Sequence, residues 1–193
     1  MARRLAVVAL MAALAFTPAC GDGASGPPSV PGGAVWVEDP FSGGYPTYDD
    51  EATGLRVVFG TPDLGAGASR VSFALFDFEG LVSYPALNVQ TRFYPDGPEE
   101  GYRTVEEAAL TFAPFPDGGR GIYTGTLAFA EPGLWAIDAA VPQADGTVAR
   151  VVFPVEVSRE PSAPAVGDPA PASVNRTADD VDDLRALTTA TTP

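Results

Sequence analysis

The fold is decided by residues 121–157, which read GIYTGTLAFAEPGLWAIDAAVPQADGTVARVVFPVEV. Apolar side chains recur at every second position in the first part, where Tyr123, Leu127 and Phe129 share one side with Gly125. This period of two is typical of a half-buried β-strand. Pro-Gly and Asp-Gly pairs then interrupt the pattern, as tight turns require. The stretch therefore predicts three strands, at 122–129, 134–141 and 148–157.

The same alternation continues toward the N-terminus. It predicts further strands at 35–38, 54–60, 70–77, 87–94 and 107–112. Seven or eight short strands separated by Gly- and Pro-rich turns indicate an all-β sandwich or barrel over residues 34–158. The one helical candidate is a single turn at 104–110. Gly125 predicts a close neighbour or a bulge, and Pro154 predicts an edge position or a bulge.

Three short motifs suggest a more specific relationship. Gly121-Ile122-Tyr123, Pro132-Gly133-Leu134-Trp135 and Val155-Glu156-Val157 resemble the last strands of immunoglobulin-like β-sandwiches, and more narrowly of YtkA-like extracytoplasmic domains. Residues 70–80 resemble an early strand and turn of the same domains. The resemblance implies an immunoglobulin-like sandwich of about seven or eight strands, with Tyr123 and Trp135 as core aromatics. It also implies stability without the immunoglobulin disulfide, because the chain has one Cys.

Composition excludes most common catalytic devices. The 193 residues include 25 acidic and 11 basic side chains, no His and one Cys, for a net charge of −14. All the basic residues are Arg, so Ser-His-Asp triads, Schiff-base lysines and thiolate zinc sites are ruled out. Some relatives of the resembled domains handle copper, but copper sites use His, Cys and clustered Met. We therefore expect no enzymatic activity, no cofactor and no nucleic-acid partner.

The N-terminus has the features of an export signal. Arg3 and Arg4 precede the apolar run 5–16, which is too short to span a membrane. Cys20 follows directly, and the arrangement resembles a bacterial lipoprotein signal, in which the Cys is lipidated. Twin-arginine export and ordinary cleavage beside a free Cys are the alternatives. We expect a signal at 1–19, then a flexible tether at 20–33 that begins at a lipid anchor on Cys20 and holds the protein on the outer face of a membrane.

The loop before the second predicted strand is the best candidate for binding. Residues 38–51 read EDPFSGGYPTYDDE. Carboxylates in loops are calcium ligands, which makes Asp39, Asp49, Asp50 and Glu51 candidates for a calcium site. The aromatic candidates for a binding surface are Phe41, Tyr45 and Tyr48. The simpler interpretations are solvated surface charge for the acids and packing on the sandwich edge for the aromatics.

Residues 159–193 predict a disordered tail or linker rich in Pro, Thr and Asp. Residues 166–171, VGDPAP, resemble the entry to a thioredoxin- or redoxin-fold domain, although the redox Cys pair is absent. The leading hypothesis is an envelope lipoprotein that displays a non-enzymatic binding or spacer module, with an unknown envelope protein or a glycan as partner. One alternative is an accessory domain of a thioredoxin-fold extracytoplasmic protein. The other is a calcium- or glycan-binding accessory domain.

Overall fold

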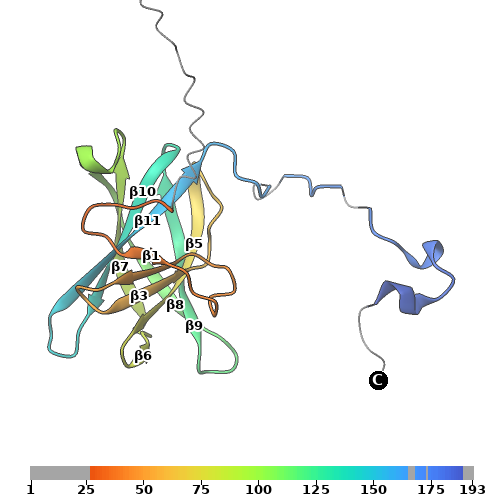
Figure 1. The fold of residues 1–193 in the computed structure, drawn as a ribbon, viewed down its shortest axis with the longest axis horizontal. Coiled ribbons are helices and arrows are strands. Elements are labelled where there is room, and N and C mark those ends of the chain that lie inside the picture. Colours follow the sequence, from red (N-terminus) through yellow and green to blue (C-terminus); the bar gives the residue numbers. More distant parts are fainter. Residues whose placement is uncertain (1–26, 165–167, 173, 189–193) are drawn as a thin grey trace, which may run out of the picture.

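The computed structural model describes residues 27–164, 168–172 and 174–188 (Figure 1). The domain is all-β, as predicted, and is built from one 11-stranded sheet. The strands are β1 (Val35–Val37), β2 (Thr47–Asp50), β3 (Leu55–Phe59), β4 (Leu64–Gly65), β5 (Gly67–Asp77), β6 (Gly80–Leu81), β7 (Ala86–Tyr94), β8 (Arg103–Pro114), β9 (Gly121–Phe129), β10 (Gly133–Pro142) and β11 (Val148–Ser158). Three short 3-10 helices complete the described part: η1 (Pro98–Glu100), η2 (Ala178–Asp180) and η3 (Leu184–Leu187).

Every segment predicted as a strand is a strand. The helical candidate at 104–110 is wrong, because these residues belong to β8 and pair with β7, for example Leu110 with Leu87. The additional strands β2, β4 and β6 contain two to four residues each. With two residues each, β4 and β6 carry too few alternating positions to be seen in the sequence. The strand β2 lies within residues 38–51, which the sequence predicts as a loop.

The strands follow the order β1-β2-β3-β5-β9-β8-β7-β10-β11-β4, and β6 pairs with β5. The pairs are antiparallel except β11 with β4. The sheet folds back on itself, because the backbone N–H of Ala34 donates to the carbonyl of Val152 on β11 at 2.7 Å. The inner faces of its two ends therefore enclose one core, which is the packing of a β-sandwich.

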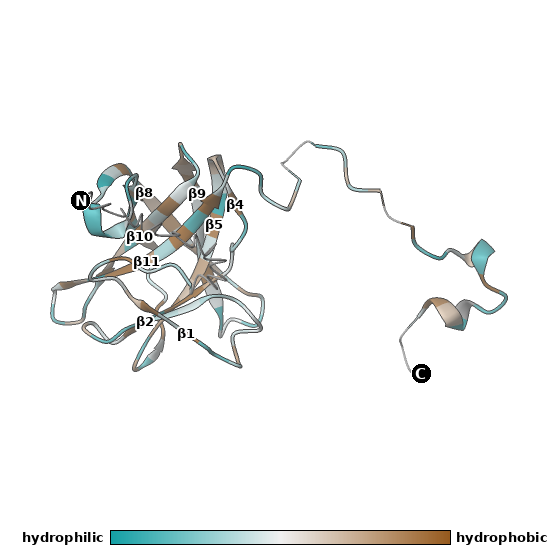
Figure 2. Cartoon of the chain, turned by 45° about the horizontal axis from the view of Figure 1, so that its top comes forward, coloured by the Kyte–Doolittle hydropathy of each residue, from teal (hydrophilic) through white to brown (hydrophobic). Residues whose placement is uncertain are grey.

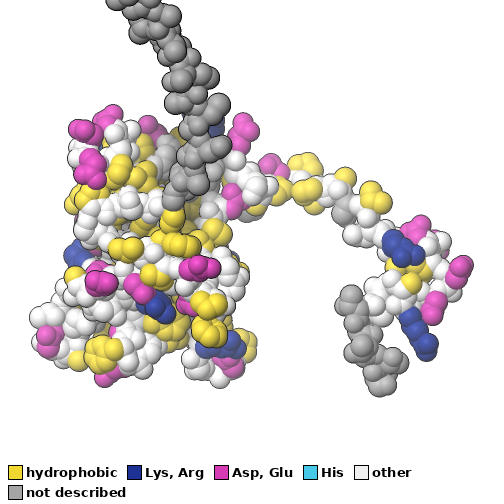
Figure 3. All heavy atoms as spheres, viewed as in Figure 1, with side chains coloured by type: hydrophobic (Ala, Val, Ile, Leu, Met, Phe, Trp, Pro, Cys, Tyr) yellow, Lys and Arg dark blue, Asp and Glu magenta, His cyan; other side chains and the backbone are white. Residues whose placement is uncertain are grey.

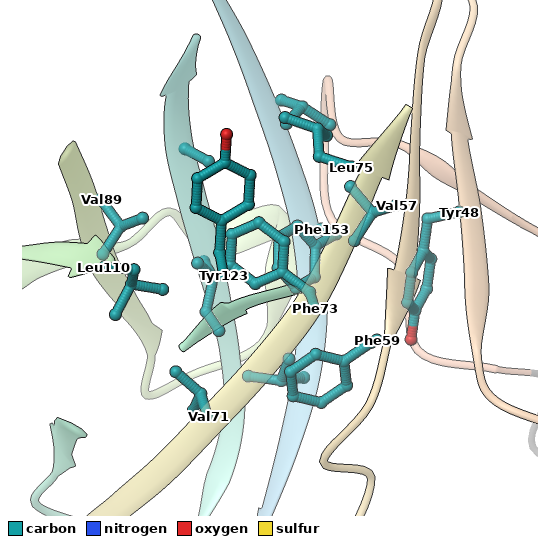
Figure 4. Close-up of a cluster of buried hydrophobic side chains, with 14 of the residues drawn as sticks. Tyr48, Val57, Phe59, Val71, Phe73, Leu75, Val89, Leu110, Tyr123 and Phe153 are labelled. Carbon is teal, nitrogen blue, oxygen red and sulfur yellow. The ribbon is translucent and has the colours of Figure 1, made fainter. Parts of the chain in front are cut away.

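Aromatic side chains from opposite layers meet in this core (Figure 4). The ring of Phe73 on β5 lies 5.4 Å from that of Phe153 on β11. It also lies 5.7 Å from the ring of Tyr123, its pairing partner on the neighbouring strand β9. Trp135 is fully buried, and its indole N–H donates to the carbonyl of Glu131 at 2.9 Å. Tyr123 and Trp135 are thus core residues, as expected. Figure 2 shows the apolar residues along the strands of this domain.

Both unusual strand residues lie where their chemistry predicts. A Cβ at Gly125 would lie 2.5 Å from Cδ2 of Leu110, so the neighbouring side chain occupies the space that a larger residue would fill. Pro154 pairs with Ala136 on one side. On its other side, β11 pairs with a strand only at Val157 and Ser158 within the described residues, so Pro154 lies on the free part of the edge.

Residues just outside the predicted limits of 34–158 also pack on the domain. Val30 is buried against Tyr94, Ala136 and Val152 on the outer face of the sheet. After β11, the backbone N–H of Ala163 donates to Asp63 at 2.8 Å. The predicted signal 1–19 and Cys20 lie outside the described residues. Within the described ranges, none of the helices has the length and apolar character needed to cross a membrane.

Candidate ligand groove

A groove with a volume of about 880 Å³ lies on the outer face of β2, β3 and β5. Its floor follows from strand alternation. Leu55, Val57 and Phe59 point into the core, so Arg56 and Val58 of β3 point out. They pair with Phe76 and Ala74 of β5, which completes a mainly apolar floor.

Four connections form the walls of the groove: the β1–β2 loop and the β2–β3, β5–β6 and β8–β9 turns. All except the β2–β3 turn contribute an aromatic side chain that the core does not use. Phe41 is 95% exposed, Phe78 is 91% exposed and Phe115 is 40% exposed. Hydrophobic side chains lie beside charged ones on this face of the molecule (Figure 3). Gathered exposed aromatics of this kind mark interaction surfaces.

The β1–β2 loop is held by its own hydrogen bonds. Asp39 accepts a bond from the backbone N–H of Phe41 at 2.8 Å, and its carbonyl accepts one from the Ser42 hydroxyl at 2.9 Å. Gly43 and Gly44 then take positive φ angles of 68° and 88°, which residues with a Cβ rarely adopt. The sequence Asp-Pro-Phe-Ser-Gly-Gly therefore folds into a turn that leaves Phe41 pointing away from the core.

Arg56 is the charged centre of the groove floor. Its guanidinium makes two bonds to the carboxylate of Asp49, at 2.6 and 2.8 Å, and lies 3.7 Å from Asp39. The hydrogen bond from Arg56 lowers the pKa of Asp49, and the same bond raises the pKa of Arg56. Arg120 on the groove wall is likewise paired, with Asp117 at 2.9 Å. Both Arg residues of the groove are therefore neutralised by the protein itself.

Three carboxylates of the groove have no Arg partner within the described residues. Asp50 accepts bonds from backbone N–H groups after β2, and Asp77 accepts them from Glu79 and Gly80 at 2.7 and 3.0 Å. No partner is found for the Glu51 side chain within the described chain. Since no Arg there pairs with these three residues, the groove has a negative potential.

The structure brings most of the sequence candidates together. Asp39, Asp49, Asp50, Glu51, Phe41 and Tyr45 all line the groove. Tyr48 does not, because it points into the core, with its ring 6.0 Å from that of Phe153, and burial raises its pKa. The carboxylates do not converge on a point: the described residues contain no group of three or more acidic, His or Cys side chains placed to hold a metal ion. The calcium prediction therefore gains no support from the geometry.

Several groove residues escaped the sequence analysis, namely Arg56, Phe76, Phe78, Phe115 and Arg120. A signal for two of them was present. Phe78 stands in the turn sequence Asp-Phe-Glu-Gly, and Phe115 precedes Pro-Asp-Gly-Gly. A large aromatic residue within a turn has no strand face to bury it, and this position alone predicts exposure.

A second polar cluster lies on the outer face of β7, β10 and β11. Asp138 is fully buried and pairs with Arg92 and with Arg150, the latter at 2.8 Å. Arg150 also donates to Gln90 at 3.2 Å, beside a smaller groove of about 490 Å³. The guanidinium of Arg92 stacks over the Tyr102 ring at 4.4 Å. The charges of the cluster pair with one another, as in a structural ion pair, although Oδ1 of Asp138 and Nε of Arg92 have no hydrogen-bond partner among the described residues.

No protein-family model matches this chain, and a comparison with curated proteins finds no significant match. The resemblance to YtkA-like domains and to lipoprotein signals therefore stays a prediction from the sequence. The class that the fold and groove define is an all-β domain of sandwich type with one aromatic-rimmed, negatively charged surface groove.

Proposed function

We propose that this protein is an envelope lipoprotein that displays a non-enzymatic binding module outside the membrane. In this proposal, Cys20 carries the lipid anchor and the groove over β2, β3 and β5 is the binding face. The observation that supports it best is the set of exposed aromatics around the groove. Phe41 and Phe78 are more than nine-tenths exposed, at 95% and 91%, and stabilise no core.

Binding explains this exposure better than folding does. An apolar side chain left in water forfeits about 1.5–3 kcal/mol of burial that it could contribute elsewhere. Aromatic residues are also the side chains that supply most of the energy at interface centres. The groove walls are four separate connections on a continuous sheet, an arrangement in which loops carry function and a rigid scaffold positions them.

The test compares two tyrosines that have the same exposure. Tyr45 lines the groove, whereas Tyr102 lies beside Arg92, and each is 50% exposed. The immobilised full chain would be incubated with a solubilised envelope fraction, and the retained material would be analysed by mass spectrometry. We expect Tyr45→Ala and Phe78→Ala to lose a retained component that wild type and Tyr102→Ala both keep. Equal retention by all four proteins would refute the groove as the binding face.

A further inference from the structure

We propose that the ligand of the groove is an extended, basic polypeptide segment in which Lys or Arg alternates with apolar residues. This inference rests on the proposed binding function and adds the chemistry of the ligand. It follows from three properties of the groove on the outer face of β2, β3 and β5: its charge, the separation of its contact groups and the apolar character of its floor.

The charge of the groove determines the charge of the ligand that it can attract. The groove is lined by Asp39, Asp49, Asp50, Glu51 and Asp77 against Arg56 and Arg120. The guanidinium of Arg56 is paired with Asp49 and Asp39, and that of Arg120 is paired with Asp117. The net charge of the whole chain is also negative, at −14. Acidic peptides, phosphorylated ligands and acidic glycans are therefore repelled, whereas a cationic ligand is attracted and steered.

The separation of the contact groups sets the size of the ligand. The carboxylates without an Arg partner lie at two different places: Asp50 and Glu51 where β2 ends, and Asp77 at the end of β5. The exposed aromatics Phe41, Phe78 and Phe115 stand on three different connections, and no ring contact joins any two of them among the described residues. A small cation would reach only one of these groups. An extended chain presents a side chain every 3.3 Å or so and reaches several.

The apolar floor distinguishes a polypeptide from a sugar. Val58, Ala74 and Phe76 offer no hydrogen-bonding side-chain group, and the Arg56 guanidinium is already occupied by Asp49. A neutral oligosaccharide would bury hydroxyl groups here without partners, which costs free energy. Apolar side chains of a peptide would bury against the same floor favourably, and its cationic groups would reach the rim.

The test uses the full chain in detergent micelles and short fluorescent peptides, read by anisotropy. The first probe has the repeat Lys-Phe-Lys-Leu, the second has Glu in place of each Lys, and the third has Gln in place of each Lys. We expect the Lys probe alone to bind, with an affinity that falls as salt rises. Glu51→Arg reverses a rim charge and should lower the affinity for the Lys probe about fivefold. Phe78→Ala should lower this affinity as well. Glu99→Arg on η1, outside the groove, is the matched control and should leave the affinity unchanged.

The outcomes separate this proposal from the function on which it rests. Tighter binding of the Glu or Gln probe, or an affinity that Glu51→Arg leaves unchanged, would overturn the basic ligand. Binding of a neutral oligosaccharide that Phe78→Ala abolishes would overturn the polypeptide while keeping the groove. If no probe binds but Tyr45→Ala still loses an envelope component, the ligand class is wrong and the binding function stands. If that component is also retained equally by all variants, both proposals fail.

Discussion

Single residues in this protein show how burial changes their chemistry. The core contains Tyr123, fully buried between Phe73 and Phe112, and burial raises the pKa of Tyr123 to about 12. The chain has no Lys and no His. Tyrosine is therefore the side chain that dominates titration between pH 9 and 12. Alkaline unfolding of this protein is for that reason a direct measure of its buried phenols.

The prediction for Tyr123 follows from its raised pKa in the folded protein. The unfolded tyrosine loses its proton near pH 10, before the folded one. Stability is complete below pH 10 and is lost as the pH rises toward the folded pKa of about 12. We expect Tyr123→Phe to unfold at the same denaturant concentration as wild type at pH 7 and at a higher one at pH 11. Parallel loss of stability in both proteins up to pH 11 would contradict the assignment.

The ion pairs of Asp138 allow a second prediction at this scale. Its carboxylate is completely buried, and the Arg92 side chain is 16% exposed, whereas that of Arg150 is 43% exposed. Removing one member of a buried pair costs about 3–5 kcal/mol, because the other charge stays buried. Asp138→Ala should therefore destabilise the protein by about 3 kcal/mol in urea unfolding. Arg150→Ala should cost clearly less, since Asp138 keeps its pair with Arg92. Equal losses for Asp138→Ala and Arg150→Ala would contradict this, because they would mean that Arg92 alone does not compensate the buried carboxylate.

At the scale of elements, the sequence predicted the long strands because each has enough alternating positions to show its buried face. It did not predict β4, which is set by pairing with the distant strand β11. It also missed β2 and β6, which pair with strands that neighbour them along the chain. Only part of the groove could be predicted from the sequence. Its β1–β2 loop candidates, Phe41 and Tyr45, are local in sequence, whereas Phe78 and Phe115 reach them only through the folded sheet.

The β8–β9 hairpin gives a prediction about an element. Gly121 begins β9, and a Cβ there would lie 2.8 Å from the carbonyl oxygen of Ala113, a backbone atom that cannot move aside. Gly119, in the same turn, has open space around it and no positive φ. We expect Gly121→Ala to lower the free energy of unfolding by about 1–3 kcal/mol. Gly119→Ala should leave it equal or raise it slightly, and a destabilised Gly119→Ala would argue against this turn geometry.

For the whole molecule, we propose a lipid anchor at Cys20 that precedes a folded module with an exposed groove. If the signal is removed after residue 19, Arg3 and Arg4 are lost, and nine Arg then face 25 carboxylates, for a net charge of −16. A chain this acidic is repelled by anionic lipid headgroups. Stable attachment to a membrane would then depend on several acyl chains at Cys20, each contributing about 0.8 kcal/mol per buried CH₂.

This dependence gives a prediction for Cys20, the only Cys of the chain. We expect wild type to enter the detergent-rich phase in a phase-separation assay and Cys20→Ala to stay in the aqueous phase. Glu99→Ala, a surface change in the folded domain, is the control and should partition like wild type. If Cys20→Ala entered the detergent phase as fully as wild type, attachment would have another cause.

The most direct test of the central claim is the intact mass of the protein purified from the membrane fraction of its own host. We expect a chain that begins at Cys20 and is heavier than residues 20–193 by the mass of several acyl chains. A membrane-derived protein with an unmodified Cys20, or one that retains residues 1–19, would contradict it.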